Sequence, residues 1–154
     1  MVQKEKSILI VDDDETILRS IRDYLALKGY DVETAKTGKE AIEKSNKHFF
    51  NLAILDIKLP DMDGTELLTK IHDTEPRMVK IILTGYGNFG NAVDSVNKRA
   101  NAYLVKPIEP KKLLEIIEKK LNEQDEELRM DRKKLIAYME SRDKEPSSKK
   151  HKIS

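Results

Sequence analysis

Five short runs of β-branched and apolar residues alternate along the chain with segments of helical periodicity, and this alternation limits the fold more than any other feature. The first, third and fourth runs are apolar almost without a break, as in parallel strands buried on both faces. The second run alternates apolar and polar residues, which favours an edge position. Strands and helices in this order predict a doubly wound α/β fold around a five-stranded parallel sheet. The runs are Ser7–Val11, Val32–Ala35, Leu52–Leu55, Lys80–Leu83 and Ala102–Val105.

The segments between the runs carry apolar residues on one helical face, together with helix start and stop signals. Gly29 is suited to end the first helix, and Thr37 with Glu40 forms a capping box at the start of the second. A fourth helix is predicted around residues 92–96. Pro110 is suited to the first turn of the fifth helix.

Charge and composition exclude several classes of function. The 154 residues include 29 Lys and Arg against 28 Asp and Glu, a formal charge of +1, which argues against nucleic acid as a main partner. The absence of cysteine excludes disulfides, thiolate metal sites and a cysteine nucleophile. No apolar run is long enough to cross a membrane, and the N-terminus lacks the apolar region of a signal peptide. We therefore expect a cytoplasmic protein.

The chain is predicted to have one domain and a C-terminal extension. Residues 1–121 form the predicted domain, residues 122–141 extend its last helix, and residues 142–154 form a disordered charged tail. Leucines recur every seven residues along the last helix, which suggests a coiled coil. The companion positions are half polar, so a solvated single helix is the alternative. The heptad leucines are Leu114, Leu121, Leu128 and Leu135.

Polar side chains follow four of the five predicted strands. Asp12 and Asp13 follow the first strand and Asp56 follows the third, while Thr84 and Lys106 follow the fourth and fifth. Ligands of open α/β sheets bind beyond the carboxyl ends of the strands, where the strand order reverses. With the strand order 2-1-3-4-5, the first and third strands are neighbours. Their carboxylates then share one cleft, with the threonine and the lysine nearby.

Carboxylates crowded in this way repel one another by energies on the order of kcal/mol, so the site needs a compensating cation. Mg²⁺ fits better than zinc, because the cleft offers oxygen ligands without histidine or cysteine. A metal held by two carboxylates beside a third carboxylate and a lysine suits phosphoryl transfer, with Asp56 as the nucleophile. Asp14 is instead predicted to cap the first helix.

The segments that carry these residues resemble the signature segments of receiver domains from two-component response regulators. The resemblance covers about residues 5–121 and matches in both order and spacing. It implies the flavodoxin-like, CheY-like form of the doubly wound fold, a three-layer sandwich. The matching segments are Ile8–Asp14, Leu55–Gly64, Leu83–Gly85 and Tyr103–Pro107.

The resemblance also implies roles for the residues of the cleft. Asp56 accepts a phosphoryl group from a histidine kinase or a phosphotransfer protein. The carboxylates of Asp12, Asp13 and Asp56 and the backbone carbonyl of Lys58 hold Mg²⁺. Lys106 pairs with the phosphoryl oxygens, and its bond to the following proline is expected to be cis.

A conformational switch is implied as well. Thr84 hydrogen-bonds the phosphoryl group, and Tyr103 is the aromatic residue that turns inward when the threonine moves. This changes the face formed by the fourth helix, fifth strand and fifth helix, through which a downstream protein is recognised. Homodimers are expected through this face or the C-terminal helix. The chain would be no enzyme beyond its own phosphorylation and dephosphorylation. It is predicted to act as a stand-alone receiver, and a piece of a longer regulator is the alternative.

Three other functions are compatible with parts of the sequence. The segment Ile8–Thr16 also fits the signature of haloacid-dehalogenase-type phosphatases, with Asp12 as nucleophile and Asp14 as acid and base. That class needs a final acidic pair after the last strand, where only Glu109 stands, and it leaves Asp56 unused. Gly85–Gly90 is a literal GxGxxG dinucleotide motif, but one remaining strand cannot complete that fold. A receiver that binds without phosphorylation has no support, since all the signature positions are present.

Overall fold

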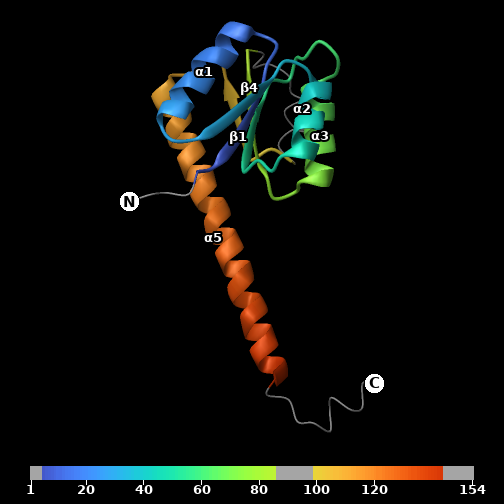
Figure 1. The fold of residues 1–154 in the computed structure, drawn as a ribbon, viewed down its shortest axis with the longest axis vertical. Coiled ribbons are helices and arrows are strands. Elements are labelled where there is room, and N and C mark those ends of the chain that lie inside the picture. The colour runs from blue at the N-terminus through green and yellow to red at the C-terminus, as the bar shows by residue number, and fades with distance from the viewer. Residues whose placement is uncertain (1–4, 86–98, 144–154) are drawn as a thin grey trace. The chain divides into compact units, whose positions relative to one another are not determined.

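The computed structural model describes residues 5–85 and 99–143. This part of the chain forms one five-stranded sheet in the order β2-β1-β3-β4-β5, which confirms the predicted fold and strand order (Figure 1). The fourth helix predicted around residues 92–96 lies outside the described residues. The elements are β1 (Ser7–Val11), α1 (Glu15–Leu27), β2 (Asp31–Ala35), α2 (Gly38–Lys47), β3 (Leu52–Leu55), α3 (Gly64–Thr74), β4 (Val79–Thr84), β5 (Ala102–Val105) and α5 (Pro110–Asp143).

Successive residues of each strand face opposite sides of the sheet, and each side packs against different helices. On β1, Leu9 and Val11 belong to the apolar cluster that includes α2 and α3. Ile8 and Ile10 belong to the cluster that includes α1 and the first turns of α5. Figure 1 shows these helices on the two sides of the sheet, so residues 5–85 and 99–121 form a three-layer sandwich. Strands buried on both sides explain the unbroken apolar runs.

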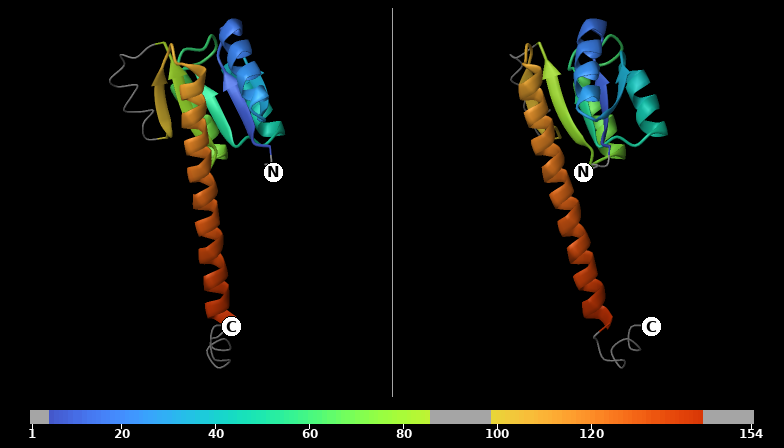
Figure 2. Two further views of the ribbon diagram at one scale, coloured as in Figure 1. Left: turned by 90° about the vertical axis from the view of Figure 1, so that its left-hand side faces the viewer. Right: turned by 60° about the vertical axis from the view of Figure 1, so that its left-hand side comes forward.

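The described strands pair in parallel throughout, so their carboxyl ends meet at one edge of the sheet (Figure 2). Leu55 lies opposite Val11 in the pairing of β1 with β3, the two strands at the centre of the reversal. The residues that follow these two strands are therefore forced into one cleft.

Local signals place the helix ends much as the sequence predicts. The Asp14 carboxylate accepts from the Thr16 and Ile17 amides at the start of α1. Gly29, with φ of +98°, follows the end of α1 in a conformation that glycine adopts without strain. The capping box is only half formed. The Thr37 hydroxyl accepts from the Glu40 amide, but the Glu40 carboxylate accepts from the amide of residue 36, one position before the cap.

Strand β4 is longer than predicted and contains a buried lysine. It runs from Val79 to Thr84, so the threonine is its last residue and does not follow it. The side chain of Lys80 is buried, and its Nζ donates to the carbonyl oxygens of Glu75 and Met78 at 2.8 Å. Burial lowers the pKa of Lys80 from its ordinary 10.5 to about 8. This lysine is tolerated inside the strand because it binds the carbonyls of the loop before β4.

Helix α5 runs from Pro110 to Asp143, the last described residue. The chain divides into two compact units, residues 1–121 and residues 122–154. Large apolar side chains are exposed on the part of α5 that belongs to the second unit, and the tail from residue 144 lies outside the described residues. No helix in the described ranges has the length and apolar composition required to span a bilayer. The exposed apolar residues are Leu128, Met130, Leu135, Ile136, Tyr138 and Met139.

Candidate functional site

Strand pairing brings three carboxylates together at the edge of the sheet. The Asp56 amide donates to the Val11 carbonyl at 3.0 Å, which extends the pairing of β3 with β1 by one residue. Asp12 and Asp56 are therefore neighbours, and each has at least one carboxylate oxygen within 4.8 Å of an oxygen of Asp13. Asp12 and Asp56 are buried, whereas Asp13 is exposed. The predicted acidic cluster is therefore present as a geometric unit.

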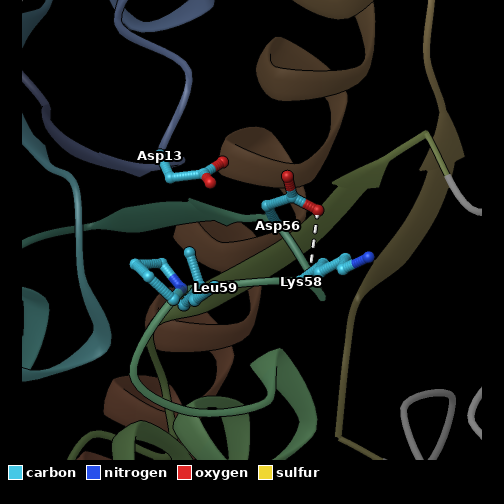
Figure 3. Close-up of a pocket in the computed structure, with 5 residues that line it drawn as sticks. Asp13, Asp56, Lys58 and Leu59 are labelled. Carbon is cyan, nitrogen blue, oxygen red and sulfur yellow. Dashed lines mark hydrogen bonds between the residues drawn. The ribbon is translucent and has the colours of Figure 1, made fainter.

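The cluster opens into a pocket of about 350 Å³. The Asp13 carboxylate extends toward Asp56, and the side chain of Lys58 extends away from Asp13 (Figure 3). The Lys58 amide donates to Asp56 Oδ1 at 3.2 Å, which orients the Asp56 carboxylate. Leu59 and Pro60 complete the lining. The pocket thus combines carboxylate oxygens with space for a small polar group.

Lys106 balances the charge of the two buried carboxylates. Its Nζ lies 2.5 Å from Asp12 Oδ2 and 3.1 Å from Asp56 Oδ2. Burial lowers the pKa of Lys106, but the hydrogen bonds and charges of Asp12 and Asp56 outweigh burial and hold it above the ordinary 10.5. Burial raises the pKa of the Asp12 carboxyl above 3.8, since the bonds from Lys106 and the Asp14 amide offset only part of the desolvation.

Thr84 and Tyr103 lie at the same side of the sheet but on different strands. Thr84 is fully buried at the end of β4, and its carbonyl accepts from the Lys106 amide at 2.7 Å. The Lys106–Pro107 bond is cis, as expected. Tyr103, on β5, is half-buried against the apolar cluster that includes α2 and α3, and burial raises the pKa of its phenol. Every residue predicted for the site is described. Asp12, Asp13, Asp56 and Lys106 meet at the carboxyl edge of the sheet, Thr84 ends β4 at that edge, and Tyr103 lies two residues before the end of β5.

The loop between β3 and α3 folds back on itself beside the acidic cluster. A bridge joins Lys58 to Asp63, and the Gly64 amide donates to the Ile57 carbonyl at 2.5 Å. A Cβ at Gly64 would lie 2.4 Å from the Asp56 carbonyl oxygen, so only glycine fits at the start of α3. The close approach fixes the backbone that follows Asp56, at its carbonyl and at Ile57.

The sequence did not predict the role of Asp61, a residue of this loop that accepts two backbone hydrogen bonds. The Asp61 carboxylate accepts from the Gly38 amide at 2.8 Å and from the Lys39 amide at 2.9 Å, both at the start of α2. The sequence does hold a signal, because Asp61 follows a proline in a loop and Gly38 opens a helix. Nothing in the sequence indicates that the two segments meet.

The comparison with known proteins decides between receiver domain and phosphatase. Residues 8–118 match the response regulator receiver domain family. The chain belongs to this family. Receiver domains are the signalling domains of two-component response regulators, so the phosphatase alternative is not favoured. The position of Asp14 agrees, since its carboxylate accepts from two amides of α1 and Asp14 does not line the pocket as an acid or base of that class would.

Several relatives of the receiver domain can be named. The CheY-like receiver domain protein of Methanospirillum hungatei JF-1 is 52% identical with a TM-score of 0.77, covering 80% of this chain and 99% of that one. Transcriptional regulatory protein GlrR of Escherichia coli (strain K12) is 32% identical over 123 residues, which are 80% of this chain and 28% of that protein. Transcriptional regulatory protein SrrA of Staphylococcus aureus (strain NCTC 8325 / PS 47) is 34% identical over 107 residues, 70% of this chain and 44% of that protein. This chain therefore spans less than half the length of these two curated relatives.

Proposed function

We propose that the receiver domain accepts a phosphoryl group on Asp56 from a histidine kinase or a phosphotransfer protein. The observation that carries the proposal is the meeting of three carboxylates and Lys106 at the carboxyl edge of the sheet, where Asp13 and Asp56 line a pocket. Asp56 supports the role of nucleophile best, because it lines the pocket and its Oδ1 is oriented by the Lys58 amide. Asp12 is less suited, since it does not line the pocket and its Oδ2 lies closer to Lys106 Nζ, at 2.5 Å against 3.1 Å for Asp56 Oδ2.

The donor atoms of the cleft fit Mg²⁺. The described ligands are carboxylate oxygens, and a hard divalent cation that keeps several waters needs only a few of them. We propose that Asp12, Asp13 and Asp56 hold the ion together with the backbone carbonyl of Lys58. Magnesium bound there would neutralise negative charge on the phosphoryl group during transfer.

The remaining residues are proposed to bind the phosphoryl group after transfer. Asp56 Oδ would attack phosphorus, and the histidine nitrogen of the donor would leave with the bonding electron pair. The phosphoryl group brings a charge of roughly −1.5 to −2 and three acceptor oxygens. Lys106 then exchanges part of its bonding with Asp12 and Asp56 for those oxygens, and the Thr84 hydroxyl donates to one of them.

The hydrogen bonds that Lys106 and Thr84 form with the phosphoryl group couple phosphorylation to a change of conformation at the protein surface. Both residues gain hydrogen bonds only in the phosphorylated state, so they bias an equilibrium between two conformations. We propose that Tyr103 follows this change and alters the face formed by β5, α5 and the predicted fourth helix. A downstream protein target would recognise that face, in the cytoplasm, without turnover of any other substrate by this chain.

Removing the metal tests this proposal directly. The full chain incubated with acetyl phosphate and Mg²⁺ should gain the mass of one phosphoryl group, and tandem mass spectrometry should place it on Asp56. With EDTA in place of Mg²⁺, the rate of adduct formation should fall about 100-fold or more, because the charge on the transferring group is then compensated only by Lys106. Equal rates of adduct formation with EDTA and with Mg²⁺ would show that the proposed Mg²⁺ requirement is wrong. If no adduct forms under any condition, the proposed phosphorylation of this domain is wrong.

We also propose that the domain ends near residue 121 and that residues 122–141 self-associate. In a parallel pair of helices, Leu128 and Leu135 of the two copies would face each other, and Glu127 of one copy would lie near Arg132 of the other. Both leucines are at least 40% exposed in this single chain. Asp131 stands between them at a companion position, so we expect a weak association.

Sedimentation velocity measures this association. Replacing Leu135 with lysine should weaken dimerisation of the full chain about tenfold, since a charge would enter the apolar seam. Met130→Lys is the matched control, because Met130 is 44% exposed but lies two residues from Leu128 and so faces away from the seam. Equal sedimentation of the full chain and of a chain ending at Leu121, with a phosphoryl mimic bound, would exclude the association.

A further inference from the structure

The loop that lines the phosphorylation pocket is hydrogen-bonded to α2, a helix that contributes no residue to the lining of that pocket. This loop, residues 57–63, runs from the phosphoacceptor to the start of α3, and its tip reaches the first turn of α2. Asp61 Oδ1 accepts from the Gly38 amide and Oδ2 accepts from the Lys39 amide. One carboxylate thus binds two of the four amides that the start of a helix leaves without a helical partner.

Two further amides at the start of α2 are satisfied within the segment itself. The Thr37 hydroxyl accepts from Glu40, and the Thr37 carbonyl accepts from Ala41. Thr37 and Asp61 therefore cap the same helix from two directions, one locally and one from the loop. The bonds to two amides lower the pKa of the Asp61 carboxyl, as expected for a carboxylate at the positive end of a helix.

A close steric contact supports the same attachment. A Cβ placed on Gly38 would lie 2.5 Å from Sδ and Cγ of Met62, so the methionine side chain lies directly on the helix backbone. Met62 also packs against the apolar cluster of α2 and α3. The tip of the loop is therefore attached to α2 both by the hydrogen bonds of Asp61 and by the packing of Met62.

The base of the loop is fixed as well, and the pocket lining lies between the two attachments. The bridge between Lys58 and Asp63 and the tight packing of Gly64 on the Asp56 backbone close the base. Lys58, Leu59 and Pro60 line the pocket between that base and Asp61. Fixing the tip therefore restricts the segment that carries the Lys58 carbonyl.

We propose that Asp61 is a positioning residue for the phosphorylation site, because its carboxylate ties the loop to the start of α2 and so preforms the oxygen site for Mg²⁺. The inference rests on the proposed function of the acidic cluster. Asp61 acts through the loop and touches neither metal nor phosphoryl group. Its carboxylate is held by α2, which also keeps a fourth negative charge from turning toward the other three.

Two matched variants separate positioning from simple stability. Asp61→Ala removes the loop attachment, whereas Thr37→Ala removes the other cap of the same helix and leaves the loop untouched. Asp63→Ala removes a carboxylate two residues away that makes no capping hydrogen bond. Asp61→Asn keeps one acceptor oxygen and serves if the alanine variant fails to fold.

Mg²⁺ binding to the full chain, measured by calorimetry, should weaken about tenfold in Asp61→Ala, by less in Asp61→Asn, and by less than about twofold in Thr37→Ala and Asp63→Ala. The rate of phosphorylation by acetyl phosphate should show the same split, with a higher apparent constant for Mg²⁺ and an unchanged rate at saturating Mg²⁺. Folding of each variant is checked by circular dichroism.

The possible outcomes test the positioning role of Asp61 separately from the proposed phosphorylation of Asp56. If Asp61→Ala, or Asp61→Asn where the alanine variant is unfolded, binds Mg²⁺ as tightly as the wild type, the positioning role is wrong and the phosphorylation site stands. If Thr37→Ala weakens Mg²⁺ as much as Asp61→Ala, the effect comes from α2 and the positioning role is again wrong. If the wild-type chain neither binds Mg²⁺ nor gains a phosphoryl group, both the proposed function and the positioning role of Asp61 are wrong.

Discussion

Replacing Asp56 with asparagine is expected to abolish the phosphoryl adduct completely while leaving the protein folded. The carboxamide has nearly the same shape, and its Oδ1 can still accept the hydrogen bond of the Lys58 amide. It lacks the anionic oxygen that attacks phosphorus. The variant also removes one of three neighbouring negative charges, so we expect no large loss of stability.

The other two carboxylates of the cluster are poor substitutes as nucleophiles. Asp12 does not line the pocket, and its Oδ2 lies 2.5 Å from Lys106 Nζ, closer than Asp56 Oδ2 at 3.1 Å. Asp13 is exposed and has no described hydrogen bond that would orient it toward a phosphoryl group. For this reason we expect the adduct to be lost and not transferred to a neighbour.

Intact-mass measurement after incubation with acetyl phosphate and Mg²⁺ checks this result. Asp63→Asn is the matched control, since Asp63 is an exposed carboxylate of the same loop and should leave the adduct unchanged. An Asp56→Asn protein that gains the adduct at the wild-type rate would show that another residue is the phosphoacceptor.

The sequence predicted the five strands because each is bounded by clear local signals, whereas the full strand order came with the resemblance to receiver domains. Apolar runs that are buried on both sides stand out from their surroundings, and Asp14, Gly29 and Pro110 mark helix ends through contacts within a few residues. The acidic cluster could be predicted for the same reason. Because β1 and β3 pair in parallel as neighbours, the backbone alone brings together the residues that follow them.

Contacts between distant segments could not be predicted in this way. Lys80 was included in an apolar run, and its burial depends on the loop carbonyls that fold around its Nζ. The bonds from Asp61 to the start of α2 join residues more than 20 positions apart. Such contacts arise from packing of the helices on the sheet, which periodicity alone does not describe.

Lys106→Met is expected to produce the largest loss of stability among single changes at the site. The side chain keeps its length but loses the charge that lies between Asp12 and Asp56, whose side chains are 5% and 9% exposed. Removing one partner of a buried ion pair leaves the others uncompensated, at a cost of about 3 kcal/mol. We expect the free energy of unfolding to fall by about that amount at pH 7 in EDTA.

Chemical denaturation of matched variants measures this loss. Lys58→Met removes an exposed lysine beside the same pocket and should change stability by less than about 0.5 kcal/mol. Adding Asp12→Asn to Lys106→Met should recover most of the loss, because one of the two facing charges is gone. The coupling in this double-mutant cycle should be about 2 kcal/mol. Purely additive effects would show that Lys106 does not balance Asp12.

The pH dependence of the Lys106→Met deficit gives an independent check of its electrostatic origin. Burial already raises the pKa of Asp12 above 3.8 in the wild type, and without the lysine it should rise further. Between 3.8 and that raised pKa, the folded variant binds more protons than the unfolded chain, so its stability falls as the pH increases through this window and then levels off. The deficit should therefore be small near pH 4 and complete at pH 7. Saturating Mg²⁺ at pH 7 should reduce it as well, because a cation bound by the same carboxylates offsets their repulsion. A deficit that is equal at both pH values and insensitive to Mg²⁺ would mean that the lost contribution is packing of the lysine stem and not its charge.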